Sequence, residues 1–156
     1  MPDRKPPRLA GDGRATLLGL LQYQRDSFVR KVIGVEAKDA EISPVPSGTS
    51  LLWLTNHVAD AEITWVLQRF AQKRDDELFE APATDLNGAV ARYQRTWRKV
   101  DSVVAETVSL DALCPSFNDH PRVNLRWILA HLLEETARHA GHADILRENI
   151  DGQTGR

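Results

Sequence analysis

The stretch LRWILAHLLEETARHAGHADILRENID, residues 125–151, decides the fold that this sequence can adopt. Its apolar residues recur every three or four positions, which is the spacing that lines one face of an α-helix. Asn124 is a suitable N-cap, and Gly152 can adopt the left-handed conformation that ends many helices. The pattern therefore predicts one helix from about Asn124 to Asp151–Gly152. Its apolar stripe consists of Leu125, Ile128, Leu132, Thr136, Ala140, Ala143, Leu146 and Ile150.

Three earlier segments have the same periodicity and predict three more helices. No segment shows the strict alternation of polar and apolar residues that is typical of a strand. The sequence therefore predicts an all-α protein, a four-helix bundle. The expected bounds are Arg14 to Gly34, Thr49 or Ser50 to about Arg74, and Leu86 to about Val104 after the capping pair Thr84–Asp85.

Length and composition favour a single domain. The chain has 156 residues, of which 42% are hydrophobic and 27% charged, and this suits one core with a solvated surface. Residues 1–13, which are rich in proline and basic side chains, are expected to form a loose N-terminal segment, and residues 14–156 the bundle. The connections near 36–48 and 109–123 are long enough to cross the bundle, so an up-down-up-down order is not required.

Charge and cysteine content exclude several classes of protein. The formal net charge is −2, so there is no basic excess to neutralise the phosphates of a nucleic acid. No run of about 18 apolar residues could span a membrane, and the first residues lack the apolar stretch of a secretory signal. The single cysteine, Cys114, cannot form an internal disulfide, which suits a reducing compartment. We therefore expect a cytoplasmic protein with neither a nucleic acid nor a membrane as partner.

Three of the five histidines lie on the last predicted helix, on the same side as Glu135. At ~100° per residue, with His131 at zero, Glu135 falls at roughly 40°, His139 at roughly 80° and His142 at roughly 20°, while the apolar stripe centres near ~110°. His139 therefore points close to the middle of the buried face, and Glu135 lies on its flank. A buried carboxylate and imidazole are costly unless paired or metal-bound, and their i, i+4 spacing suits two ligands of one metal.

His57 is the candidate for a third ligand, because it is the only histidine outside the last third of the chain and lies beside an apolar stripe. Two imidazole nitrogens and one carboxylate oxygen form a recurrent catalytic zinc set. Two simpler interpretations are open at this point. His57 could be a core residue hydrogen-bonded to a neighbour, and Glu135 and His139 could form only an ion pair along the helix.

The remaining polar and aromatic residues carry weaker signals. The four tryptophans are expected mainly in the core, although Trp127, at about 320° on the wheel, points away from the stripe. Cys114 has no basic neighbour in the sequence that would activate it. We expect His120 near the mouth of the bundle, Asp144 facing solvent, and Arg126, Arg138 and Arg147 as solvated partners of Glu134 and Glu148.

Two stretches, SLLWLTNHVADAE (50–62) and LRWILAHLLEETARHAGHADILRE (125–148), resemble the DinB-like superfamily of metal-binding four-helix bundles. The resemblance extends from about Arg14 to Gly155. It implies His57, Glu135 and His139 as metal ligands, with a glutamate where the common pattern has a histidine. In this respect the chain is similar to the branch containing mycothiol-dependent maleylpyruvate isomerase.

The resemblance implies a divalent metal, zinc or nickel, and low-molecular-weight thiol chemistry. The reaction would be transfer of a thiol such as mycothiol or bacillithiol to an electrophile, or thiol-assisted isomerisation. The alternative is a non-enzymatic, stress-linked dimeric module with a structural or vestigial metal. His131, His142 and Asp60 are candidates for orienting the ligands or a substrate by hydrogen bonding. The resemblance, together with the outward direction of Trp127, also predicts a homodimer.

Overall fold

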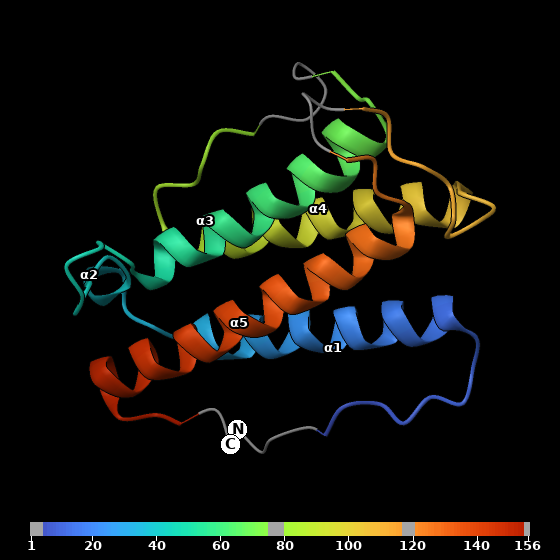
Figure 1. The fold of residues 1–156 in the computed structure, drawn as a ribbon. Coiled ribbons are helices and arrows are strands. Elements are labelled where there is room, and N and C mark those ends of the chain that lie inside the picture. Colours follow the sequence, from blue (N-terminus) through green and yellow to red (C-terminus); the bar gives the residue numbers. More distant parts are fainter. Residues whose placement is uncertain (1–4, 75–79, 117–120, 155–156) are drawn as a thin grey trace.

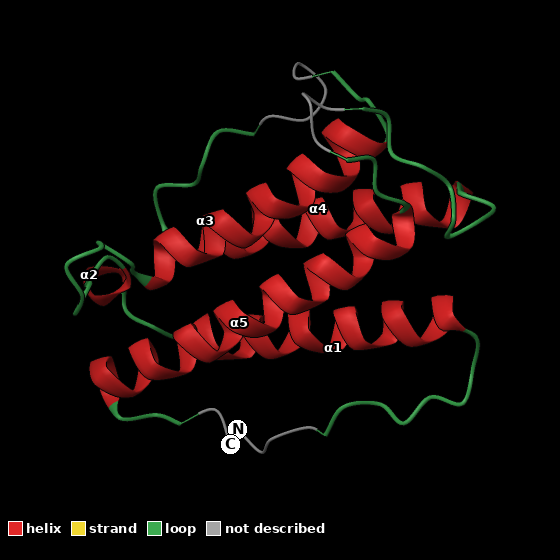
Figure 2. Cartoon of the chain, in the orientation of Figure 1, coloured by secondary structure: helices red, strands yellow, loops and turns green. Residues whose placement is uncertain are grey.

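Four long helices make up most of the computed structural model, which describes residues 5–74, 80–116 and 121–154 (Figure 1). Figure 2 shows that loops join the helices, and the described residues form no strand beyond an isolated bridge between Leu113 and Asn124. The predicted all-α fold is confirmed. The elements are α1 (Gly13–Val32), α2 (Ala37–Ala40), α3 (Leu51–Glu62), the π-helix η1 (Ile63–Phe70), α4 (Leu86–Glu106) and α5 (Leu125–Asp151).

Side-chain caps explain where the long helices begin. Asp12, Ser50, Asp85 and Asn124 each accept a hydrogen bond from the backbone N–H three residues later, so each satisfies a donor that the first turn leaves without a partner. At the other end of α5, Gly152 has φ 73°, the left-handed conformation expected of it. The sequence therefore predicts where α1, α3 and α4 begin, and where α5 both begins and ends.

The second helix differs from the expectation in its last third. After Glu62 it widens into η1, where the N–H of Ala71 donates to the carbonyl of Val66, five residues earlier, at 2.8 Å. It ends at Phe70 rather than near Arg74, and Gln72 then adopts φ 51°, which cannot continue a helix. π-helical turns are rare and are frequent at functional sites.

The helices run as two parallel pairs that face each other. Helix α1 runs alongside α5 in the same direction, because Gly13 lies next to the Arg126 side chain and Lys31 forms an ion pair with Asp144 at 2.6 Å. Helix α4 runs alongside α3 in the same direction (Figure 1). The chain therefore returns across the bundle between Phe70 and Leu86. The connections near 36–48 and 109–123, although long enough to cross, join helix ends at the same end of the bundle.

Apolar side chains fill the bundle, with two exceptions among the tryptophans. Trp97 is buried, but Trp53 and Trp127 are 49% and 45% exposed. The expectation that the tryptophans are mainly core is therefore wrong for Trp53, whereas Trp127 points outward, as its position on the helical wheel indicated. Two clusters make up the core, one around Phe28 and Trp97 and one around Leu21 and other leucines. No helix in the described part of the chain combines the length and apolar character needed to cross a bilayer.

A buried ion pair that the sequence did not reveal joins α1 to α3. Arg25 donates to both carboxylate oxygens of Glu62, at 2.8 and 2.7 Å, and to Asp101 at 2.8 Å. The side chains of Arg25 and Glu62 are each 1% exposed. Burial raises the pKa of Glu62, and the adjacent guanidinium opposes that rise. Two parallel hydrogen bonds between the guanidinium and the carboxylate compensate for the burial of both charges.

Two arginines of α5 behave differently from the expectation. Arg147 is buried and donates to the carbonyls of Lys31 and Ile33, so it caps the end of α1 instead of pairing with Glu148 in solvent. Arg126 pairs with Asp111, whereas Arg138 does pair with Glu134 at 2.7 Å. Asp144 is only partly solvent-facing because Lys31 holds it.

Candidate metal centre

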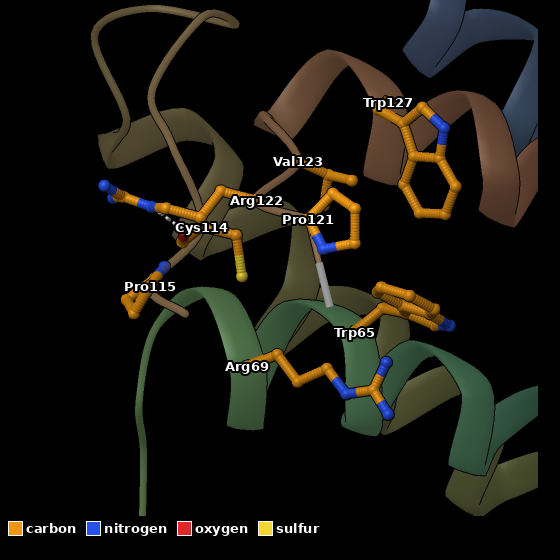
Figure 3. Close-up of a pocket in the computed structure, with 8 residues that line it drawn as sticks. All are labelled: Trp65, Arg69, Cys114, Pro115, Pro121, Arg122, Val123 and Trp127. Carbon is orange, nitrogen blue, oxygen red and sulfur yellow. Dashed lines mark hydrogen bonds between the residues drawn. The ribbon is translucent and has the colours of Figure 1, made fainter. Parts of the chain in front are cut away.

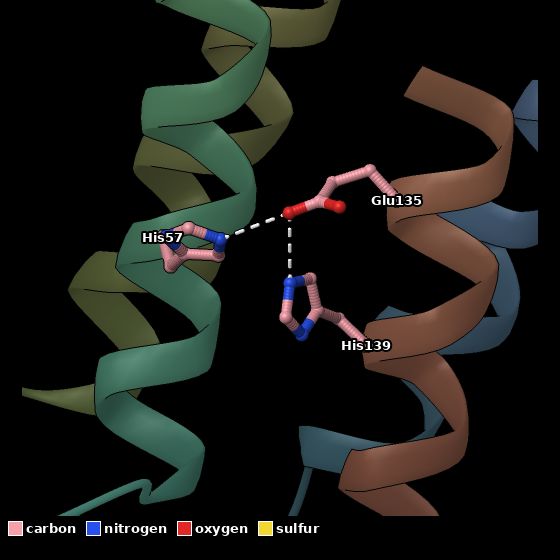
Figure 4. A group of neighbouring side chains, drawn as sticks. All are labelled: His57, Glu135 and His139. Carbon is pink, nitrogen blue, oxygen red and sulfur yellow. Dashed lines mark hydrogen bonds and ion pairs between the residues drawn. The ribbon is translucent and has the colours of Figure 1, made fainter. Parts of the chain in front are cut away.

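Helices α3 and α5 bring His57, Glu135 and His139 together (Figure 4). The Nε2 atoms of His57 and His139 lie 3.1 and 3.0 Å from the same Glu135 oxygen, Oε1. The three donor atoms all lie within 4.8 Å of one another, and the two imidazole rings meet edge to face with centroids 4.7 Å apart. Side chains from two helices that run in opposite directions therefore converge on one point.

The surroundings of the three side chains set their charges. Burial raises the pKa of Glu135, but hydrogen bonds to His57 and His139 outweigh it, so the pKa lies below its ordinary value. Burial lowers the pKa of His139, although Glu135 acts in the opposite direction. At neutral pH the pair is therefore a carboxylate and a neutral imidazole, the protonation states in which these groups bind metals.

The donor set fits a borderline-soft divalent cation. Two imidazole nitrogens and one carboxylate oxygen suit zinc or nickel, whereas calcium and magnesium prefer sites made of oxygen alone. Glu135 is the shared partner of both imidazoles, and the His139 side chain is 11% exposed while the His57 side chain is 35% exposed. The set is therefore held from the protein interior and is open toward the His57 side.

Of the three residues expected to orient the ligands, one lies against a candidate ligand in the structure. His142 Nδ1 lies 3.3 Å from His139 Nδ1. His131 instead stacks on Trp127, with ring centroids 5.1 Å apart. Asp60 is bound by the Arg92 guanidinium, on the side of α3 that faces α4.

Trp53 is a neighbour of the site that sequence reasoning missed. Its ring stacks on His57 with centroids 4.8 Å apart and planes 8° from parallel. The signal was present, because Trp53 precedes His57 by four residues on the same helix and so shares its face. The stacked ring restricts the orientation in which His57 can present Nε2.

A cavity lies further along the same pair of helices, next to Cys114 (Figure 3). The sequence shows no basic neighbour for this cysteine, but the fold brings Arg69 and Arg122 beside it in the cavity wall. Burial nevertheless raises the pKa of the Cys114 thiol, and the two arginine charges only partly offset that rise. His120, expected near this end of the bundle, lies outside the described residues.

We expect Cys114 to react slowly with alkylating reagents at neutral pH. Because its pKa lies above the ordinary value of 9.0, the thiolate fraction, and with it the rate, should still be rising at pH 9.5. The rate constant for iodoacetamide, followed by mass spectrometry between pH 7 and 10, measures this directly. If the alkylation rate reached a plateau below pH 8.5, the two arginine charges would outweigh the effect of burial on the Cys114 pKa.

The chain is similar to known proteins in family and in fold. A family model described as mycothiol-S-transferase matches residues 16–152. No curated protein matches the sequence. Among solved structures, a conserved protein from Enterococcus faecalis superposes with a TM-score of 0.70 at 15% identity, over 92% of this chain and 100% of that one. At that identity the likeness shows the fold alone.

Proposed function

Because this chain belongs to the mycothiol-S-transferase family, we propose that it is a metal-dependent enzyme that transfers a low-molecular-weight thiol, such as mycothiol, to an electrophile, or isomerises a substrate with the thiol's help. The observation that carries the proposal is the convergence of His57, Glu135 and His139, whose donor atoms lie within 4.8 Å. These three side chains are the proposed ligands of a divalent metal, zinc or nickel.

Each ligand has a distinct part in the proposed site. A divalent metal held by three protein side chains keeps an open position, in which it lowers the pKa of a thiol and favours its thiolate. Glu135 contributes negative charge, and the two imidazoles each contribute a ring nitrogen. His142 contacts the far side of the His139 ring at 3.3 Å and so fixes the orientation of that ligand.

Metal analysis of untagged protein, followed by a screen of thiols against electrophiles, tests the proposal. We expect one equivalent of metal per chain and turnover with at least one thiol. Full metal occupancy without turnover of any thiol would instead favour a module with a structural metal. A protein that binds neither zinc nor nickel would contradict the proposed enzyme and favour a module whose metal site is vestigial.

The proposed division between ligand and support is tested by comparing Glu135→Gln with His142→Ala. Glu135→Gln should weaken metal binding strongly because it removes a negative charge from the ligand set. His142→Ala should retain the metal and lose about 10–100-fold in thiol-transfer rate, the usual effect of removing a residue that orients a ligand. Metal occupancy of both variants at equal ionic strength decides the matter. If His142→Ala empties the site while Glu135→Gln leaves it full, the ligands are His57, His139 and His142.

We also propose a homodimer, supported by the exposed rings of Trp53 and Trp127. Exposed aromatic side chains are enriched at interfaces between subunits. Trp127 already contacts Trp65 and His131, so a partner would cover only its outer edge. Sedimentation velocity at micromolar concentration should show a dimer that Trp127→Ala weakens. A monomer throughout that range would refute the proposal.

A further inference from the structure

A cavity of about 460 Å³ opens where η1 meets the start of α5 (Figure 3). That volume accommodates a small organic molecule. Figure 3 shows Trp65 and Trp127 together on one side, with the Cys114 thiol pointing toward the middle of the space. The other lining residues are Arg69, Pro115, Pro121, Arg122 and Val123.

The walls of this cavity combine flat aromatic surface with positive charge. The Trp65 and Trp127 rings lie 5.2 Å apart at 58°, and the Arg69 guanidinium lies 4.3 Å from the centre of the Trp65 ring. Arg122 also lines the cavity, and its Nε–H donates to the carbonyl of Cys114 at 3.1 Å, while its guanidinium points away from the two tryptophans (Figure 3). Tryptophan faces favour a planar apolar group, and arginine favours a carboxylate or another anion.

The cavity and the candidate metal centre share one seam between α3–η1 and α5. His131 touches both tryptophans, with centroids 4.9 Å from Trp65 and 5.1 Å from Trp127. It also lies one helical turn from Glu135. Trp127 precedes Glu135 by eight residues, which is ~12 Å along a helix. That separation is within the length of an ordinary organic molecule.

We propose that this cavity binds an organic anion with a planar apolar part, as the outer end of a substrate whose reactive end lies at His57, Glu135 and His139. Its role as a substrate subsite rests on the proposed function, whereas its affinity for such an anion does not require a metal. The same chemistry could belong to the thiol or to the electrophile, and each can be tested separately as a competitor of the probe.

The test uses metal-free protein and benzoate, with Cys114 as reporter because it is the only cysteine in the chain. Benzoate should slow alkylation of Cys114 by neutral iodoacetamide several-fold at saturation and change the tryptophan fluorescence at the same concentration. Benzamide, which has the same shape but no charge, should bind at least about tenfold more weakly, because hydrogen bonds to charged groups are the stronger ones. Equal protection by both probes, or none by benzoate, would overturn the proposal.

Single substitutions test whether benzoate binding depends on the Arg69 charge and on the Trp127 ring rather than on the overall integrity of the fold. Arg69→Gln should weaken benzoate binding about tenfold or more, whereas Arg69→Lys should keep part of the affinity because it keeps the charge. Trp127→Ala should weaken binding, and Trp53→Ala is its matched control, a tryptophan of similar exposure that lies against His57 instead. Unchanged affinity in both Arg69→Gln and Trp127→Ala would also overturn the proposal.

The same experiment distinguishes this inference from the proposed function. His139→Ala should keep benzoate protection of Cys114 in full, since the cavity does not include His139. Benzoate binding by a protein that takes up neither zinc nor nickel when these metals are supplied would support the cavity and contradict the metal site. Metal binding without protection of Cys114 by benzoate would support the metal site and contradict the proposed cavity ligand.

Discussion

Replacing His139 with alanine is expected to abolish tight binding of zinc or nickel while leaving the helices intact. His139 supplies one of the three proposed donor atoms and is 8% exposed, so water cannot replace it without opening the core. Loss of a residue that merely supports a ligand costs about 10–100-fold in affinity, and loss of a ligand should cost more. Calorimetric titration with zinc measures the affinity, and far-ultraviolet circular dichroism checks the helices.

His131→Ala is the matched control for this variant. It removes a histidine from the same face of α5, one turn before Glu135, but its ring packs on Trp65 and Trp127 rather than on the proposed ligands. Metal affinity should be unchanged in His131→Ala. The ligand assignment is wrong if His139→Ala binds zinc as tightly as the parent protein.

Arg25→Ala is expected to cost about 3–5 kcal/mol of unfolding free energy, the usual effect of leaving one member of a buried ion pair without its partner. The substitution removes both hydrogen bonds to the Glu62 carboxylate, which is 1% exposed and lies in the interior. It also removes the guanidinium that lies 5.8 Å from the centre of the Trp97 ring. Urea denaturation of the two proteins measures the difference.

The Arg25→Ala loss should grow with pH. Without the guanidinium, burial raises the pKa of Glu62 further above its ordinary value of 4.5. As pH rises, the unfolded chain then loses the Glu62 proton before the folded protein does, so stability falls from pH 4.5 up to the folded pKa. Arg95→Ala, which breaks the exposed pair with Glu80, is the control and should leave stability unchanged within error. Equal effects of the two substitutions would show that burial gives Arg25 no special role.

Helix α5 and its inward-facing residues could be predicted from sequence, because in a regular helix the spacing between residues determines the direction of each side chain around the axis. The wheel placed His139 near the centre of the buried face and Glu135 on the flank. The structure has His139 buried and the Glu135 side chain 17% exposed. His57 is different, because the periodicity of its own helix shows which face it lies on but not which residues on other helices it contacts. Its approach to Glu135 depends on packing between helices, and the resemblance to a known family supplied that step.

What could not be predicted depends on pairs of residues far apart in the sequence. Arg25 and Glu62 are 37 positions apart on different helices, and each alone is typical of a solvated surface. Arg147 also has the composition of a surface residue, and its burial follows from the carbonyls that end α1. For Trp53 and Trp127, residue type alone suggested burial, although the helical wheel pointed Trp127 away from the core. Tryptophan is usually buried, but here two of the rings stack against histidines near the surface.

The row formed by Trp127, His131, Glu135 and His139 does not run straight along α5. Each step of four residues turns ~40° beyond a full revolution, so the row winds from the outside of the bundle to its inside. Trp127 is 45% exposed and His139 is 8% exposed. The proposed substrate would lie along this row, with its reactive end at the more buried residues and its other end closer to solvent. If this proposal holds, changes to the outer end of a substrate should affect its affinity more than the rate of its chemical step.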